Sequence, residues 1–349
     1  MRALVMDRIG GPLEVRTVAD PRPPSDGVVV AVQATGLCRS DWHAWAGHED
    51  LSLPHVPGHE FAGVIVAVGS QVRQHMVGDR VTVPFVCGCG ACRWCRAGSA
   101  QVCPQQQQPG FTYWGSFAQY VAVPAADVNL VGIPESVSFA AAAGLGCRFA
   151  TAYRALTGVG GLQRGHWLTV VGAGGVGLSA VMIGKALGAN VIAVDRTAGA
   201  LAAADALGAD RTVVADGTAT TTDIAAAIHE ITGGGSDLGV DAVGHQSACE
   251  LSILSLRRHG RHVQVGLLPP VDGHPRVPMD RVIAWEISVL GSHGMAAVDY
   301  PPMMAMIERG DLRPHDLIQR TITLEEAARA LPAMDSASPA GITLIDPSA

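Results

Sequence analysis

The chain has 349 residues, a length that suggests two domains, and its 48% hydrophobic and 16% charged residues are typical of a soluble globular protein. Its formal net charge of −7, without a basic stripe or a lysine-rich arm, argues against a nucleic-acid-binding surface. The N-terminus reaches the charged Asp7 and Arg8 too early for a signal peptide, and no apolar run could span a membrane. We therefore expect a cytoplasmic protein.

The first 150 residues are predicted to be rich in β-strands. Short runs of alternating or β-branched residues occupy 28–32, 61–68, 80–84 and 117–123. Turn-forming residues separate these runs, which favours a compact β-rich domain in this half of the chain.

Four cysteines in this half have spacings that suit a metal site. They form the pattern C-x2-C-x2-C-x7-C and are Cys89, Cys92, Cys95 and Cys103. Four thiolates this close in sequence can surround one tetrahedral zinc ion and leave no position for substrate, so the pattern predicts a structural zinc. Disulfides remain the alternative, although a cytoplasmic chain disfavours them. Cys87, two residues upstream, is either an idle neighbour or an exchange ligand.

A second group of candidate ligands is spread along the same half. Cys38 and Cys147 lie on either side of a Pro-Gly-His-Glu turn that presents His59 beside Glu60. Two sulfurs and one imidazole nitrogen can bind zinc with a fourth position open, which is the ligand set of a catalytic zinc. Spacing does not show that these residues meet, and a structural role for His59 stays open. The remaining thiol, Cys249, is expected to be a small buried hydrophobic side chain.

From about residue 150 the pattern changes to alternating helices and strands. Six apolar runs predict the strands of a doubly wound parallel sheet, at 168–171, 191–194, 212–214, 238–243, 262–266 and 287–291. Helices are predicted between them, including one that ends at 207 and others at 224–231 and 248–258. The tail beyond 293 has amphipathic helices at 302–309 and 324–331, and we expect it to pack on the N-terminal half.

The first strand of that sheet runs into a glycine-rich turn. Gly172, Gly174 and Gly177 form a G-x-G-x-x-G pattern that opens a helix. The first glycine makes the tight turn, the second lets the backbone approach a pyrophosphate, and the third lets helix and strand pack closely. The helix N-terminus, with Gly175 and Val176, presents free N–H groups and the positive end of its dipole to that pyrophosphate.

The next strand ends on an acid, Asp195. Its spacing along the sequence from the glycine turn is the one at which a carboxylate accepts hydrogen bonds from a ribose 2′-OH. A carboxylate repels the 2′-phosphate of NADP, so the pattern favours NAD as the cofactor. The neighbouring Arg196 could meet such a phosphate, which leaves the strictness of that preference open.

Together these features resemble the zinc-dependent alcohol dehydrogenases of the medium-chain dehydrogenase/reductase family. The resemblance covers essentially the whole chain and rests on GLCRSD at 36–41, GHEFAG at 58–63, the four-cysteine lobe, LGC at 145–147 and the glycine turn. It implies an α/β protein with a GroES-like β-rich catalytic domain at 1–149 and 293–349, including a zinc-binding lobe at 87–104. A Rossmann NAD-binding domain at 150–292 interrupts it, and the family places the catalytic zinc in the cleft between the two.

By this resemblance, Cys38, His59 and Cys147 ligate the catalytic zinc, which lowers the pKa of the alcohol. Glu60 is then a nearby carboxylate that can approach the metal when water exchanges. Asp41 is expected to accept a hydrogen bond from His59, which would fix the tautomer of the imidazole and raise its basicity as a ligand.

The resemblance also assigns a proton relay and the cofactor contacts. The alcohol proton leaves through Ser40, the cofactor ribose and His43, an imidazole whose ordinary pKa suits a shuttle, while hydride passes to the nicotinamide. The other contacts are Arg39 at the pyrophosphate, Thr151 at the nicotinamide, and Val265, Gly266 and Leu267 beside the carboxamide. For Arg39 the alternative is a solvated surface arginine.

One residue departs from the best-known members of the family. Arg148 follows Cys147, where those members carry a glycine, and it would either anchor a carboxylate substrate, repel cationic substrates or pair with a nearby acid. Phe85, Trp42 and the loop at 111–114 are expected to form the walls of a roomy apolar pocket.

The sequence therefore predicts an NAD-linked alcohol dehydrogenase with two zinc ions per chain, acting on primary or secondary alcohols and the matching aldehydes or ketones. We expect a homo-oligomer, a dimer or tetramer, that pairs through the strand at 287–291. A polyol dehydrogenase or another carbonyl reductase is the nearest alternative, but polyol enzymes usually carry a carboxylate in place of Cys147. A zinc-free quinone or enoyl reductase would have no use for the three ligands. An inactive nucleotide-binding protein would require a broken site.

Overall fold

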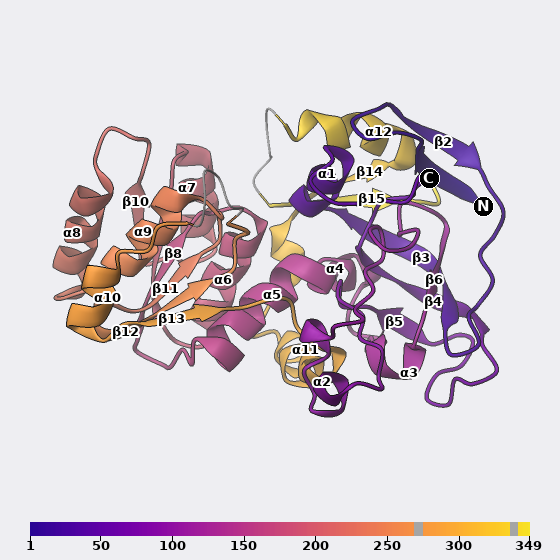
Figure 1. Cartoon of the computed structure of the whole chain (residues 1–349), viewed down its shortest axis with the longest axis horizontal. Helices are drawn as coiled ribbons and strands as arrows, with labels where there is room; N and C mark the ends of the chain where they lie inside the picture. Colours follow the sequence, from indigo (N-terminus) through magenta and orange to yellow (C-terminus); the bar gives the residue numbers. More distant parts are fainter. Residues whose placement is uncertain (269–274, 336–340) are drawn as a thin grey trace. The chain divides into compact units, whose positions relative to one another are not determined.

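The computed structural model describes residues 1–268, 275–335 and 341–349. They divide into two compact units, unit 1 with residues 1–150 and 294–349 and unit 2 with residues 151–293 (Figure 1). Among the described residues, no helix is long and apolar enough to cross a membrane.

Unit 1 is built on one large, mainly antiparallel sheet. Its strands are β3 (Val28–Leu37), β4 (Glu60–Val68), β5 (Arg80–Thr82), β6 (Tyr120–Val123), β7 (Val131–Gly132), β14 (Ile318–Thr323) and β15 (Ile342–Asp346). The order across the sheet is β14-β15-β3-β4-β5-β7, and β6 also pairs with β3. Because β15 pairs with β3, the C-terminal tail packs on the N-terminal half, as expected, but it does so by adding strands to this sheet, which the sequence analysis did not predict. A two-stranded antiparallel sheet is formed by β1 (Arg2–Met6) and β2 (Leu13–Thr17).

The helices of unit 1 are short and lie around these sheets. They are α1 (Arg39–Trp45), α2 (Arg93–Arg96), α3 (Ala126–Asn129), α4 (Phe139–Ala143), α11 (Tyr300–Glu308) and α12 (Leu324–Ala333). A π-helical turn at Leu145–Phe149 follows α4, and α5 (Ala150–Arg154) continues from it into unit 2.

The central strand β3 is longer than predicted. It continues past residue 32 to Leu37, because its pairing with β4 extends to the pair Gly36 and Glu60. Every second residue of a strand points to the same face, and this period places valines of β3 in one buried cluster with apolar residues of β4. The extension carries Cys38, the residue after the strand, to the point where β4 begins.

Unit 2 contains the six-stranded parallel sheet that the sequence predicts. Its strands are β8 (Trp167–Val171), β9 (Asn190–Asp195), β10 (Arg211–Val214), β11 (Ser236–Asp241), β12 (Leu256–Gln264) and β13 (Ser288–Gly291). They lie in the order β10-β9-β8-β11-β12-β13, which confirms the doubly wound fold class. The helices are α6 (Gly175–Ala186), α7 (Ala198–Ala206), α8 (Thr221–Thr232), α9 (Gln246–Leu254) and α10 (Met279–Trp285) (Figure 1).

Alternate residues of the central strands serve the two faces of this sheet. Val171, Ile192 and Val194 are buried in one cluster with apolar residues of α8 and α9. On the opposite face, α6 packs so closely that a Cβ at Gly184 would lie 2.8 Å from Leu168 Cδ2. Both faces are therefore covered, which is typical of a parallel sheet.

The predicted helix at 248–258 is wrong at its C-terminal end. α9 ends at Leu254, and Leu256 already belongs to β12, where it pairs with Ser236 of β11. At this strand start Arg257 also forms an ion pair with Asp237 of β11, at 2.6 Å. Tertiary pairing thus overrides the local helical pattern.

The glycine turn supplies a first prediction about stability. A Cβ at Gly177 would lie 1.7 Å from the carbonyl oxygen of Gly172, whereas a Cβ at Gly174 would meet no atom within 4 Å. We expect Gly177→Ala to lower the thermal unfolding midpoint by roughly 4–8 °C because the backbone must move apart. Gly174→Ala, the matched control, should melt with the wild type in the same calorimetric scan. Equal midpoints for all three proteins would contradict this packing.

Candidate active site and metal centres

A buried carboxylate connects the two loops that carry the first candidate ligands. Asp41, in the first turn of α1, is 1% exposed. Its Oδ2 accepts the backbone N–H of Cys38 at 2.9 Å, and its Oδ1 accepts the N–H of Gly58 at 3.2 Å. The same Oδ1 lies 2.8 Å from Nδ1 of His59. A carboxylate only accepts, so Nδ1 carries a proton, and Nε2 is the nitrogen of His59 that is left to bind a metal.

The third thiol reaches this place from the π-helical turn at Leu145–Phe149. A Cβ at Gly146 would lie 3.2 Å from Cα of Glu60 and 3.5 Å from the carbonyl oxygen of His59. Because Gly146 has no side chain, the turn can pack closely against the start of β4. Single π-turns inside helices often occur at functional sites, and this one places Cys147 among the ligands.

These residues form one group of possible metal ligands. Ligand atoms of Cys38, His59, Glu60 and Cys147 all lie within 4.8 Å of one another. Nε2 of His59 is buried and has no hydrogen-bond partner among the described residues. An orphaned buried nitrogen is costly unless it binds something, and beside two thiols a zinc ion fits it.

The charges around the group favour a thiolate at Cys38. A hydrogen bond from the Cys147 thiol lowers the pKa of Cys38 well below its usual range, against the effect of burial, and the charge of Arg148 acts in the same direction. Thiolate is the form in which cysteine binds metals.

The sequence allows three roles for Arg148, and the structure shows one of them, an ion pair with an acid. Its Nε lies 2.9 Å from Oε1 of Glu60, its backbone N–H donates to the same oxygen at 3.1 Å, and Nη2 contacts Oε2. Burial raises the pKa of Glu60, and the positive charge of Arg148 opposes that rise. A Cβ at Gly36 would lie 2.3 Å from Oε2 of Glu60, so the pair occupies space that only a glycine leaves.

The four-cysteine lobe forms a second group. Ligand atoms of Cys89, Cys92, Cys95 and Cys103 lie within 4.8 Å of one another around α2. The sulfur of Cys92 lies 3.5 Å from that of Cys95 and 3.8 Å from that of Cys103. Tetrahedral zinc with Zn–S bonds of about 2.3 Å separates its sulfurs by about 3.8 Å, whereas a disulfide needs about 2.0 Å. The lobe therefore fits zinc, and all four cysteines are free thiols.

The two remaining thiols lie outside both groups. Cys87 is buried, its sulfur is 3.8 Å from the hydroxyl of Tyr113, and burial raises its pKa to about 12. Cys249 is buried on α9, as a small hydrophobic side chain would be.

In unit 2, the glycine turn is tied to the acid that ends β9. Gly172 adopts φ +93°, which favours glycine, and Oδ2 of Asp195 accepts the N–H of Ala173 at 2.8 Å. Oδ1 of Asp195 accepts the backbone N–H and the hydroxyl of Thr197, at 3.0 and 3.1 Å. The N-cap residue of α6 is Gly174, which has no side chain to cap the helix, so the first N–H groups, at Gly175 and Val176, can meet an anion.

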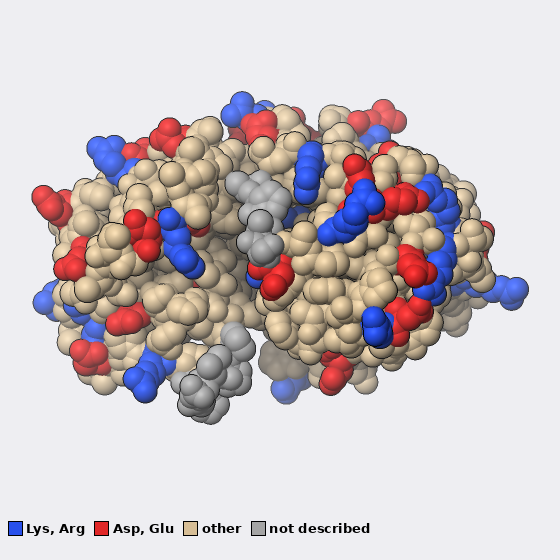
Figure 2. Space-filling view, turned by 90° about the horizontal axis from the view of Figure 1, so that it is seen from above, with Lys and Arg blue, Asp and Glu red and all other residues tan. Residues whose placement is uncertain are grey.

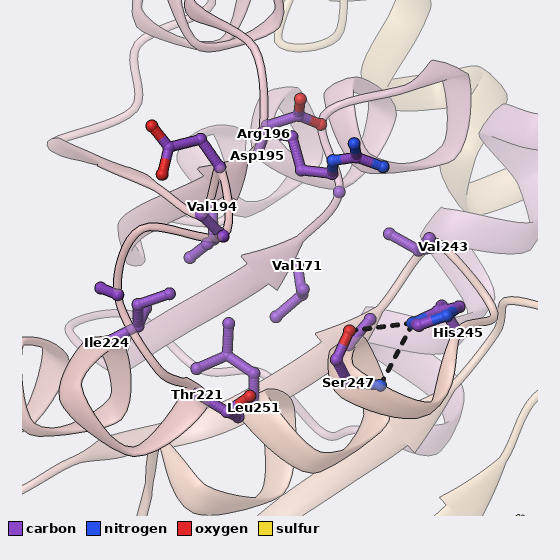
Figure 3. Close-up of a pocket in the computed structure, with 16 residues that line it drawn as sticks. Val171, Val194, Asp195, Arg196, Thr221, Ile224, Val243, His245, Ser247 and Leu251 are labelled. Atoms are coloured by element: carbon purple, nitrogen blue, oxygen red, sulfur yellow. Dashed lines mark hydrogen bonds between the residues drawn. The ribbon is translucent and has the colours of Figure 1, made fainter.

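A pocket of about 510 Å³ opens beside this turn (Figure 3). Val171, Val194, Ile224 and Leu251 form its apolar floor, and Asp195 and Arg196 lie at one side, while Nδ1 of His245 lies 2.8 Å from Oγ of Ser247 at the other. Its size and its mixed lining suit the adenosine part of a dinucleotide.

Sequence reasoning missed several residues that line this pocket. They are Ala215, Asp216, Gly217, Ala219, Thr221, Val243, His245, Ser247 and Ala248. Most follow the carboxyl ends of β10 and β11, where doubly wound folds bind ligands, and that rule could have found them.

Other predicted cofactor residues are placed as follows. Thr151 is buried, and its hydroxyl has no partner among the described residues. Val265 and Gly266 donate their N–H groups to the carbonyl oxygen of Asp241, at 3.1 and 2.8 Å, and Leu267 is 65% exposed.

Of the predicted relay and cofactor residues in unit 1, Ser40 lies beside the first ligand group, whereas Arg39 and His43 contact other residues. Oγ of Ser40 is 3.8 Å from the sulfur of Cys38. The exposed Arg39 donates to the carbonyl oxygen of Met334, and its guanidinium lies 4.1 Å from the ring centre of Trp42. His43, on the same helix, is half-buried, and its ring lies beside that of His48.

Of the residues expected to form the pocket walls, the phenylalanines lie beside the ligand group, whereas the tryptophans make other contacts. Phe85 and Phe111 contact the imidazole of His59 edge-on, with ring centres 6.1 and 5.3 Å away. Trp42 is 9% exposed and belongs to a core cluster, and Trp114 binds the carbonyl oxygen of Pro54 with its ring N–H at 3.0 Å. The two phenylalanines thus border the ring of His59.

Comparison with known proteins agrees with this geometry. The alcohol dehydrogenase GroES-like domain matches residues 24–135, and the zinc-binding dehydrogenase family matches 175–309. An alcohol dehydrogenase of Geobacillus stearothermophilus is 39% identical over 77% of this chain and 78% of its own length. An NAD-dependent alcohol dehydrogenase of Saccharolobus solfataricus is 34% identical over 99% of this chain and 100% of its own. The solved alcohol dehydrogenase TADH from Thermus sp. ATN1 has a TM-score of 0.89 at 30% identity, over 99% of both chains.

The fold and the two ligand groups thus define a zinc-binding dehydrogenase. More closely, the chain belongs to the zinc-dependent alcohol dehydrogenases of the medium-chain dehydrogenase/reductase family.

The lobe gives a prediction about metal content. Cys103→Ser removes one of four sulfurs, so the bound zinc should fall from two ions per chain to about one, measured by elemental analysis of the dialysed protein. Cys87→Ser is the matched control, because Cys87 lies two residues from the lobe yet outside its ligand group, and it should keep both ions. Loss of zinc in the control, or none in Cys103→Ser, would contradict this ligand assignment.

The buried pair gives a prediction about stability. Arg148→Met leaves Glu60 charged and without its cationic partner, and we expect a loss of about 3 kcal/mol in the free energy of unfolding. The double variant Glu60→Gln with Arg148→Met should recover much of that loss, because no charge remains buried. Arg309→Met, which removes a pair with Asp311 on the surface, should change little. Denaturant titration at equal zinc content measures all four proteins, and a fully stable single variant would refute the coupling.

Proposed function

We propose that the chain oxidises primary or secondary alcohols with NAD, and reduces the matching aldehydes or ketones, at the ligand group of unit 1. The observation that carries this proposal is the buried Nε2 of His59, which has no hydrogen-bond partner in the described part of the chain and lies within 4.8 Å of the sulfurs of Cys38 and Cys147. Three protein ligands of this kind are typical of a catalytic zinc rather than a structural one.

Two groups from outside the chain complete the chemistry. When bound, zinc supplies a Lewis acid that makes the alcohol hydroxyl more acidic, and NAD supplies the nicotinamide that accepts hydride. Cys38, His59 and Cys147 would hold one zinc ion, and the four-cysteine lobe would hold the other. The glycine turn and Asp195 would hold the cofactor, with the unpaired hydroxyl of Thr151 available to the nicotinamide.

The chain's own side chains then orient the substrate and move its proton. Asp41 keeps His59 in the tautomer that can bind metal, and Ser40 offers a hydroxyl beside Cys38 to the substrate oxygen. His43 takes the proton onward, since one ring nitrogen of an imidazole can accept a proton while the other releases one. Phe85 and Phe111 exclude water from the side of the ligands that they cover.

A polyol dehydrogenase is the second candidate. Its carboxylate ligand would have to replace Cys147, and the carboxylate nearest to the thiols here, Glu60, is engaged by Arg148. This engagement supports the alcohol reading.

The charge distribution supports a small-molecule substrate rather than a nucleic acid. On the face drawn in Figure 2, acidic and basic side chains of the described residues are interspersed. A polyanion needs a continuous basic surface, and the net charge of −7 opposes its approach.

The activity is tested by the rate of nicotinamide reduction over a panel of short, long, branched and aromatic alcohols. We expect turnover that prefers NAD over NADP and that is lost after a zinc chelator and restored by added zinc. Protein that holds two zinc ions per chain and yet turns over no alcohol would refute the proposal. The best substrate of the panel would define the size of the pocket.

A further inference from the structure

The end of helix α1 brings a second histidine back to the first. The N–H of Gly47 donates to the carbonyl oxygen of Ala44 at 3.2 Å, and the N–H of His48 donates to that of His43 at 2.9 Å. These two bonds form a Schellman motif, which needs a left-handed residue, and Gly47 has φ +89°. A Cβ on Gly47 would also lie 2.6 Å from Cγ2 of Ile9. The turn therefore depends on glycine and fixes His48 over His43.

The two imidazoles contact each other through like atoms. Nδ1 of His43 lies 2.8 Å from Nδ1 of His48, which is a hydrogen bond with one shared proton. Trp42 supports both rings, with its ring centre 5.0 Å from that of His43 and 5.5 Å from that of His48, both edge-on. His43 is half-buried and His48 is exposed, so the pair leads from the protein to solvent.

We propose that His48 is the outer station of the proton path: it accepts the proton that His43 releases and delivers it to water. This inference rests on the proposed function, because it requires that His43 receives the alcohol proton. His43 would act toward the cofactor, and His48 acts through His43 as a positioning and proton-accepting residue.

The transfer balances without any further reactant. A proton arrives at Nε2 of His43, the proton on its Nδ1 moves to Nδ1 of His48, and His48 releases the proton on its Nε2 to water. Only N–H bonds form and break, and both rings end neutral. Exchange with water then returns both rings to their starting tautomers before the next turnover.

The surroundings of His43 favour onward transfer over storage. Burial lowers the pKa of His43, and the positive charges of His48 and Arg39 act in the same direction against the opposing effect of Cys38. A protonated His43 is therefore unstable where it sits, whereas the exposed ring of His48 is hydrated.

The test separates proton transfer from a structural role of the hydrogen bond. His48→Asn keeps an amide group near the position of Nδ1, so it can hold His43 in place, but it cannot carry a proton. His48→Ala removes both functions. His315→Asn changes another exposed histidine of unit 1 and serves as the control. Zinc-loaded enzyme is mixed with NAD and alcohol, and stopped-flow records NADH absorbance together with proton release to an indicator dye.

We expect both His48 variants to release the proton roughly tenfold more slowly than the wild type at low buffer concentration. Added imidazole buffer should restore the rate in both, while the wild type and His315→Asn should not depend on buffer. A normal rate in His48→Asn, or a slow rate that imidazole does not restore, would overturn the inference. Wild-type enzyme that forms no NADH would instead refute the proposed function.

A measurement on the resting protein checks the contact itself. The shared Nδ1 proton should give a downfield imidazole N–H resonance in the NMR spectrum of ¹⁵N-histidine-labelled protein. The signal should be present in the wild type and in His315→Asn and absent in His48→Ala. Its absence from the wild type would contradict the pair on which the inference depends.

Discussion

The carboxylate of Asp41 is the interaction on which the ligand group of unit 1 depends. It is fully buried, and an unpaired buried charge would cost far more than a domain can tolerate. Three N–H donors from two loops compensate it, and because these belong to Cys38, Gly58 and His59, the compensation itself positions the ligands. One carboxylate thus fixes the direction of a thiol loop, the path of the chain before β4 and the tautomer of an imidazole.

Close backbone approach is the second shared constraint, and it operates in both units. Gly146 lets the π-helical turn lie against the start of β4, and Gly58 has φ +105° in a space where a Cβ would lie 2.5 Å from the ring of Phe117. In unit 2, Gly177 lets α6 lie against the turn at Gly172. In each place a missing side chain, rather than an added contact, determines where the functional atoms lie.

Features that depend on neighbouring residues in the sequence could be predicted, whereas contacts between distant residues could not. Each strand of the parallel sheet and the whole cysteine lobe lie in short stretches of sequence, so the spacing of their residues was enough to predict them. The meeting of Cys38 with Cys147 depends on how far β3 pairs with β4 and on a π-turn, and neither leaves a local signal. The sequence allowed an acidic partner for Arg148 but could not identify it as Glu60. The helix predicted at 248–258 was too long because the pairing of β12 with β11 outweighs the helical pattern of its last residues. The contact of His48 with His43 was not predicted, although a glycine that follows a helix, as Gly47 does, is the usual signal of a left-handed cap.

The buried pair of Arg148 and Glu60 has a consequence for how this sequence can change. Any side chain at Gly36 would collide with Oε2 of Glu60, and loss of either charge leaves the other one buried without a partner. The three positions are therefore epistatic, so that a substitution acceptable at one depends on the residues at the other two. The order in which these three residues can be exchanged without loss of stability is therefore restricted.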